Sequence, residues 1–326
     1  MSQESEPPLS IASAPPVSSS QLHTLRVGVL AGRPDLNFVT FIGNEVMRPV
    51  FWDAATALAE ALDSRGLSVR MGVNEIVRSG TNYVFGFHGL GATTRKGVLP
   101  RGSVIINSEP IANPEQVAGH IDWASYLPLL DGMHVWDYSR RNVDAFVRAN
   151  VPSASYAWVP IGYAQRNVSS LTLPPGTQDI DVLFYGRINE RRGKTLEQLR
   201  DAGLRVYAAE GGVEGTVRDQ LVARSKVVLN IGVVPDSVFE QYRVSYMLNN
   251  SKAVVTEMHD DERLPEEYTA ALAVASYDEL AATCLRLVRD DALRSRLETA
   301  APLALQSTFI AERLDAALAT IAGRTG

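Results

Sequence analysis

Four cations cluster around a glycine just past the middle of the chain. Gly186 follows the apolar residues 182–185, and directly after it come Arg187, Arg191, Arg192 and Lys194. The pattern predicts a buried strand that turns at the glycine into a helix. A helix N-terminus offers unpaired N–H groups and the positive end of its dipole, so added cations there favour a bound anion. The segment predicts a diphosphate site, while a solvated helix start is the alternative.

Four further residues of the second half are candidates for the same site. Asn230 and Gly232 follow a predicted strand, where the backbone can approach a nucleotide, although a strand-end turn explains them equally well. Arg243 stands in an otherwise apolar helix, and its guanidinium suits either a phosphate or a surface position. Glu240 is a candidate ligand contact or a plain charge near a helix N-terminus.

Two side chains of the first half could accept a proton. His88 follows a predicted strand and lies between Gly86 and Gly89, and a histidine titrates near neutral pH. Glu109 also follows a predicted strand and could act as the base of an inverting transfer. The alternatives are a hydrogen-bonded structural histidine and a turn residue before proline. Asp137 could form a turn as easily as it could catalyse.

The composition limits the class of protein. The 326 residues suffice for two domains, and 45% hydrophobic with 21% charged residues is typical of a soluble globular enzyme. The net charge of −6 argues against a nucleic-acid partner, so a cationic site must be local. A single cysteine, Cys284, excludes an internal disulfide and favours the cytoplasm. We expect no transmembrane segment and no signal peptide.

Predicted strands alternate with helices along most of the chain. Residues 1–22 are rich in Ser, Pro and Ala and predict a disordered tail. The first half, 23–165, begins with a predicted buried strand at 25–30 and a loop at 31–44. Its later strands are 68–71, 83–87, 103–107, 133–137 and 158–163, and its helices are 51–65 and 140–148.

A linker is predicted at 166–177, and the second half, 178–326, repeats the alternation. Its predicted strands are 182–185, 204–208, 226–231, 253–256 and 272–275, and its helices are 194–202, 217–224, 239–248 and those after 277. The pattern predicts two doubly wound α/β domains, each with a parallel sheet covered on both faces. Ligands of such sheets bind at the carboxyl ends of the strands, so the site is expected between the two halves.

The order of these signals resembles the GT-B glycosyltransferases, especially the group 1 enzymes and their short bacterial relatives. Residues 135–143 resemble the serine-capped helix near the end of the acceptor domain, and 158–163 resemble the turn before the crossover. Residues 184–194 resemble the G-R-x-x-x-x-K-G phosphate element, and 243–257 resemble the helix and strand beneath the nucleotide.

The resemblance implies a GT-B fold of two Rossmann-like domains, with an acceptor-side first half, a nucleotide-sugar-binding second half and a last helix that crosses back. It implies a bacterial hexosyl- or pentosyltransferase that moves a sugar from a UDP-, GDP- or dTDP-linked donor to a hydroxyl. The acceptor, a glycan, a lipid-linked glycan or a small molecule, stays open, as does inversion or retention. No cofactor and no metal are expected, because we see no Asp-x-Asp pair arranged to hold a metal between phosphates, and the other histidines lack ligand spacing.

Two positions depart from the family pattern. The glutamate that holds the ribose in group 1 enzymes falls here at Ser245 or Tyr246, which makes Tyr246 a nucleotide-site candidate. The order Gly193-Lys194 reverses the family's K-G, so Arg191 or Arg192 takes the place of the lysine. An inactive nucleotide- or sugar-binding module is therefore the alternative function. No dinucleotide-binding glycine motif follows the first strand, so a dehydrogenase or epimerase lacks support.

Overall fold

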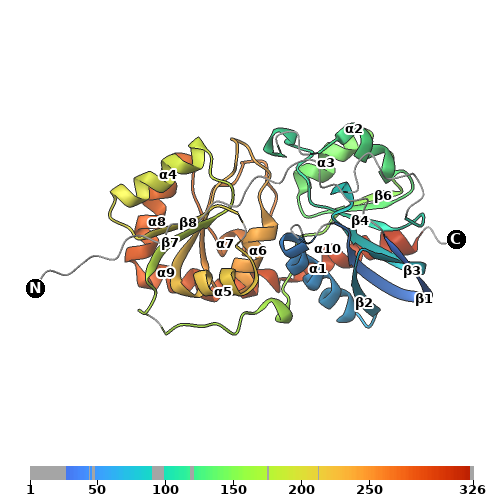
Figure 1. The fold of residues 1–326 in the computed structure, drawn as a ribbon, viewed down its shortest axis with the longest axis horizontal. Coiled ribbons are helices and arrows are strands. Elements are labelled where there is room, and N and C mark those ends of the chain that lie inside the picture. The colour runs from blue at the N-terminus through green and yellow to red at the C-terminus, as the bar shows by residue number, and fades with distance from the viewer. Residues whose placement is uncertain are drawn as a thin grey trace, which may run out of the picture.

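The chain folds into two α/β lobes that lie side by side (Figure 1). The computed structural model describes residues 27–43, 45, 48–89, 99–117, 121–174, 176–211 and 213–323. The predicted tail at 1–22 lies outside these residues, and so does Pro175 of the predicted linker. Each lobe is built on one sheet in which all strands run parallel.

The first sheet has six strands in the order β2-β1-β3-β4-β5-β6. Its helices cover both faces, with α1 on one side and the pair α2 and α3 on the other. The elements are β1 (Gly28–Phe41), α1 (Arg48–Asp63), β2 (Ser68–Val73), β3 (Glu75–Phe85), β4 (Val104–Asn107), η3 (Pro114–Val117), α2 (Trp123–Tyr126), η4 (Leu127–Leu130), β5 (His134–Asp137), α3 (Arg140–Arg148), β6 (Ser155–Trp158) and η5 (Gln165–Asn167).

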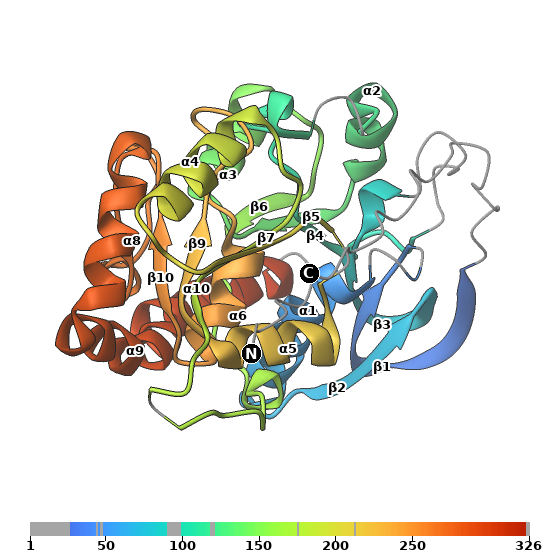
Figure 2. The same ribbon diagram turned by 60° about the vertical axis from the view of Figure 1, so that its left-hand side comes forward.

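The second sheet has five strands in the order β11-β10-β9-β7-β8. Helices again cover both of its faces (Figure 2). The elements are β7 (Ile180–Tyr185), α4 (Glu190–Asp201), β8 (Val206–Ala209), α5 (Gly215–Arg224), β9 (Ser225–Asn230), α6 (Gln241–Asn249), β10 (Ala253–Thr256), α7 (Glu266–Ala270), β11 (Ala273–Val274), η6 (Tyr277–Glu279), α8 (Leu280–Arg289), α9 (Asp291–Leu305) and α10 (Thr308–Ala322).

The buried strands of the second sheet supply two cores at once. Val182 and Phe184 of β7 pack with α4 and α8, whereas Leu183 between them packs with α5, α6 and α9. Successive strand residues point to opposite faces, so a strand buried on both faces must be apolar throughout. This is why the continuous apolar runs at 182–185 and 253–256 predict these strands correctly.

The last helix packs against the other lobe. Leu314 and Ala317 of α10 belong to the same buried cluster as Phe41, Phe51 and Tyr83 of the first sheet and α1. The chain enters this helix beside its earlier crossover, where the backbone N–H of Tyr163 donates to the carbonyl of Leu305 at 3.1 Å. The boundaries predicted at 166–177 stay a prediction.

The prediction for the first strand is wrong in its details. Residues 31–44 were expected to form a loop, but β1 continues to Phe41. Its beginning is exposed, with Val29 50% accessible, whereas its buried part runs from Leu36 onward. Pairing with β3 shifts register between Gly32 and Asn37, so the strand passes through the polar stretch that predicted a loop. Across the described ranges, none of the helices combines the length and apolar character needed to span a membrane.

Candidate functional site

The carboxyl ends of the two sheets face each other across a cavity of about 460 Å³. Both lobes contribute to its walls, as expected where ligands bind at strand ends. The first lobe supplies Val50, Phe51, Ser108, Glu109, Pro110, Gln116 and Tyr138, and the second supplies Arg187, Arg192, Val233, Glu240, Tyr242 and Arg243. Among these lining residues the cations come from the second lobe alone.

A second cavity of about 220 Å³ continues the first one along the second lobe. The two cavities share four lining residues, among them Glu240 and Arg243, so together they form one groove, here called the interlobe cleft. The extension lies at the ends of β7 and β8 and is lined further by Pro49, Asp53, Tyr185, Gly186, Gly211, Val213, Glu214, Arg218 and Tyr246.

The structure brings together the two proton acceptors that the sequence offered separately. His88 Nε2 lies 3.1 Å from Glu109 Oε1, and the side chains are only 15% and 12% exposed. The Ser108 hydroxyl also donates to Glu109 Oε1 at 2.8 Å. Burial lowers the pKa of His88 more than the neighbouring carboxylate raises it. At neutral pH His88 is therefore an uncharged donor that holds one oxygen of Glu109.

Arg243 reaches from α6 toward the turn after β7. Its Nη1 donates to Asn230 Oδ1 at 3.0 Å and pairs with Glu240 Oε2 at 2.8 Å. Its Nε is buried and makes no hydrogen bond among the described residues. Gly186 has φ +133°, and a Cβ at this position would lie 3.0 Å from Arg243 Nη2. The missing side chain therefore leaves the guanidinium open toward the cleft.

The other cations after Gly186 take three different positions. Arg187 is exposed and lines the cleft. Arg192 is buried, donates to the carbonyls of Ile231 at 2.6 Å and Arg187 at 2.8 Å, and has its pKa lowered by burial to about 10. Lys194 is exposed on α4 and lines neither part of the cleft. Asn189 caps this helix, which begins at Glu190 rather than at 194.

Arg191 lines another cavity of about 290 Å³, which lies at the ends of β9, β10 and β11 and shares Glu240 with the interlobe cleft. Its guanidinium makes a two-pronged ion pair with Glu257, at 2.8 and 2.6 Å, and lies 4.0 Å from the ring centre of Tyr277. Gly232 joins the same cluster, because its N–H donates to Glu257 Oε1 at 2.7 Å and its carbonyl accepts from Arg191. Glu257 and Tyr277 were not predicted as partners, since neither is near Arg191 in sequence.

Tyr246 lies in the cleft extension, as part of a cluster that the sequence did not reveal. Arg218 lies over its ring at 3.3 Å from the centroid, and the Tyr246 hydroxyl donates to Asp219. Arg218 also forms an ion pair with Asp53 of α1, which belongs to the other lobe. The cluster therefore bridges the lobes at one end of the cleft. Among the described residues, no group of three His, Cys, Asp or Glu side chains could hold a metal ion.

Sequence comparison finds only distant relatives. No protein-family model matches the chain. Uncharacterized protein L138 of Acanthamoeba polyphaga mimivirus is 26% identical over 136 residues, which is 40% of this chain and 15% of that protein. Protein L140 of the same virus is 24% identical over 192 residues, 57% of this chain and 59% of that protein. The chain therefore spans 15% of L138 and 59% of L140. Both relatives are viral, so they give no support to the expected bacterial origin.

Solved structures of glycosyltransferases share the arrangement of the lobes. WaaG, a glycosyltransferase involved in lipopolysaccharide biosynthesis, superposes with a TM-score of 0.55 at 11% identity, over 89% of this chain and all of that one. T4 phage BGT in complex with its UDP-glucose substrate gives 0.54 at 14%, over 88% and 99%. The chain has the GT-B fold. Sucrose-phosphate synthase from Thermosynechococcus elongatus gives 0.57 at 13% identity, over 89% and 100%. The predicted fold class is confirmed.

Proposed function

We propose that the chain is a glycosyltransferase that moves a sugar from a nucleoside-diphosphate donor to a hydroxyl acceptor. The main observation behind this proposal is that the two walls of the cleft carry different kinds of side chain. One wall presents a carboxylate with a half-buried histidine behind it, and the opposite wall presents arginines around a glycine. The solved GT-B structures that resemble this chain include T4 phage BGT with UDP-glucose as its substrate.

The donor diphosphate is proposed to lie between Gly186, Arg187 and Arg243. The glycine allows close backbone approach, and the free edge of the Arg243 guanidinium suits phosphate oxygens. As the bond to the sugar breaks, negative charge grows on the leaving diphosphate, and the cations that line the cleft stabilise that charge. The nucleoside is proposed to extend toward Tyr246, with Asn230 and Glu240 holding Arg243 in place.

Glu109 is proposed to accept the proton of the acceptor hydroxyl. His88 and Ser108 both donate to Glu109 Oε1, so Oε2 is the oxygen available for the acceptor among the described residues. In an inverting transfer the acceptor O–H bond breaks, its oxygen bonds to the anomeric carbon, and the bond from that carbon to the diphosphate breaks. If the reaction retains configuration, the leaving phosphate receives the proton instead.

Transfer is proposed to need no metal, because the arginines already face the charge that develops on the diphosphate. T4 phage BGT has been solved with UDP and Mn²⁺, so the point needs a direct test. Activity should persist in excess chelator and change little when magnesium or manganese is added. A loss of activity that either ion restores would overturn metal independence without affecting the assignment of the donor site. The cytoplasm is proposed as the site of action.

The decisive experiment screens nucleotides before sugars. UDP, GDP and dTDP are titrated by calorimetry, and the best ligand is then offered as its sugar conjugates with product detection by mass spectrometry. A nucleotide that binds should raise the melting temperature by mass action. Release of nucleoside diphosphate from one conjugate supports the transferase. Tight binding without turnover of any conjugate supports the alternative of an inactive binding module, and no binding at all would refute both.

A further inference from the structure

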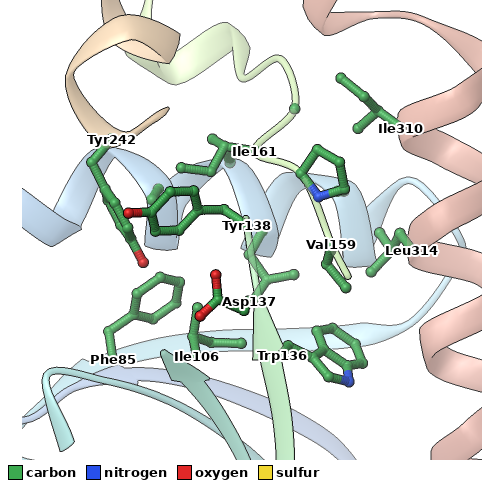
Figure 3. Close-up of a pocket in the computed structure, with 16 residues that line it drawn as sticks. Phe85, Ile106, Trp136, Asp137, Tyr138, Val159, Ile161, Tyr242, Ile310 and Leu314 are labelled. Carbon is green, nitrogen blue, oxygen red and sulfur yellow. The ribbon is translucent and has the colours of Figure 1, made fainter. Parts of the chain in front are cut away.

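A buried carboxyl group lies behind the loop that carries Glu109. Asp137 is the last residue of β5, is 1% exposed and does not line the cleft. Figure 3 shows its carboxylate in a largely apolar pocket among the side chains of Phe85, Ile106, Tyr138 and Tyr242. Burial raises its pKa well above the ordinary value, and the hydrogen bonds it accepts oppose that effect. A carboxyl group kept in such surroundings calls for an explanation.

Two asparagines connect this carboxylate to the backbone of Glu109. The Asn107 side-chain amide donates to Asp137 Oδ2 at 2.6 Å and to the Glu109 carbonyl at 2.8 Å. The Asn142 amide donates to the same carbonyl at 3.0 Å and to Asp137 Oδ2 at 3.1 Å. Each NH₂ group therefore spans the gap between the carboxylate and the carbonyl with its two hydrogens.

The far ends of both amides are fixed as well. Asn107 Oδ1 accepts from the Tyr126 hydroxyl at 3.1 Å, and Asn142 Oδ1 accepts from the Ala112 N–H at 3.1 Å. Every polar atom of the two side chains thus has a partner. Among the described residues the Asp137 side chain accepts only from N–H groups, the third being the Ser139 N–H at 2.7 Å. The NH₂ end of each amide must therefore face it. The second hydrogen of each NH₂ group is then directed to Glu109.

We infer that Asp137 is a positioning residue, which acts through Asn107 and Asn142 to hold Glu109 against His88. The inference rests on the proposed function only for its effect on turnover, since the contact between Glu109 and His88 can be measured without any substrate. Asp137 Oδ2 accepts from both amides, so replacing an acceptor oxygen with a donor releases the amides and the carbonyl together.

Asp137→Asn tests the inference, because it keeps the shape and one acceptor oxygen but replaces the charge and the other acceptor with a donor. We expect kcat to fall by about 10- to 100-fold, as small misplacements of a catalytic group do, while donor KM changes less than twofold. Asn142→Ala removes one of the two bridges and should lower kcat by a smaller factor. The kcat of the double variant should be no lower than that of Asp137→Asn alone, because the two substitutions break the same chain of hydrogen bonds.

The contact itself is read from the titration of His88 by NMR, with His88→Ala assigning its signal. The Glu109 carboxylate raises the His88 pKa. Loss of the contact between Glu109 and His88 in Asp137→Asn should therefore move the midpoint of the His88 titration to lower pH. Asp181→Asn is the matched control, since Asp181 is a buried carboxylate at the opposite end of β7. It should leave both readouts at their wild-type values.

Three results would overturn the inference: an unchanged His88 midpoint in Asp137→Asn, a matching change in Asp181→Asn, or additive effects of Asp137→Asn and Asn142→Ala on kcat. If the wild type turns over no donor, the proposed function fails, and the His88 midpoint alone decides the positioning role. If Asp137→Asn does not fold, the same two readouts on Asn142→Ala decide it: a lower kcat with a lower midpoint supports the role, and wild-type values refute it.

Discussion

Replacing Arg243 with alanine should weaken nucleoside-diphosphate binding more than any other single change on the donor wall of the cleft. Its guanidinium already uses Nη1 for Asn230 and Glu240, while Nη2 lies beside the space left by Gly186. A hydrogen bond to a charged group contributes about 1.5–3 kcal/mol. At 1.4 kcal/mol per tenfold change, Arg243→Ala should raise Kd about 10- to 150-fold.

The partner of Arg243 sharpens this prediction. Glu240 pairs with Arg243 at 2.8 Å, so Arg243→Ala leaves an unpaired carboxylate beside the proposed diphosphate. Repulsion between that carboxylate and the ligand should place the single variant near the upper end of the range. Removing Glu240 as well should recover part of the affinity, and Glu240→Gln alone should change Kd by about threefold or less.

Isothermal calorimetry with the best-binding nucleotide measures these constants, and melting temperatures confirm that each variant is folded. Lys194→Ala is the control, because Lys194 of α4 carries the same charge in the same lobe but is exposed and lines neither part of the cleft. Its Kd should stay within twofold of wild type. Unchanged binding in Arg243→Ala, or an equal loss in Lys194→Ala, would show that general positive charge rather than this guanidinium holds the diphosphate.

Three further predictions concern stability and reactivity. Arg192→Met should lower the free energy of unfolding in urea by about 2–4 kcal/mol, because it leaves buried carbonyls such as that of Ile231 unsatisfied; a loss below about 0.5 kcal/mol would contradict the structural role. Hydrogen bonding to Arg205 holds the pKa of Asp181 well below its ordinary value, so its stabilisation is present above about pH 4 and lost below it. Asp181→Asn should therefore melt below wild type at pH 7, with a gap that narrows between about pH 4 and pH 2; a constant gap would refute this. Burial raises the pKa of the Cys284 thiol, so a thiol reagent at pH 8 should label the denatured chain and leave the native chain unlabelled.

Local patterns predicted the elements whose burial is simple. The helix predicted at 140–148 is α3, and the strand predicted at 253–256 is β10. α3 is strongly amphipathic and shows the helical period, whereas β10 is buried on both faces and shows a short, largely apolar run. The apolar run at 25–30 predicted a buried strand and was misleading. Tertiary contacts bury the later part of β1 and leave Val29 and Leu30 exposed. Hydrophobicity alone does not say which end of a long strand reaches the core.

The sequence predicted the part of the site that consists of charged residues close together in the chain. The sequence showed four cations after Gly186, but their availability depends on partners that are distant in the chain. Arg191 is held by Glu257, 66 residues away, and Arg192 is held by the carbonyl of Ile231, 39 residues away. A single sequence contains no signal for either pairing. The contact between Asp53 and Arg218 is harder still to foresee, since its two residues come from different lobes.

The proposed reaction depends on the interface between the lobes. Glu109 belongs to the first lobe and Arg243 to the second, so neither side of the cleft suffices alone. The segment that leads to Glu240 is held by the first lobe, because Gln116 exchanges hydrogen bonds with Val238, at 2.8 and 3.3 Å. A substitution at Gln116 should therefore displace the segment that carries Glu240 without changing any residue of the second lobe, and it should alter donor affinity before it alters proton transfer.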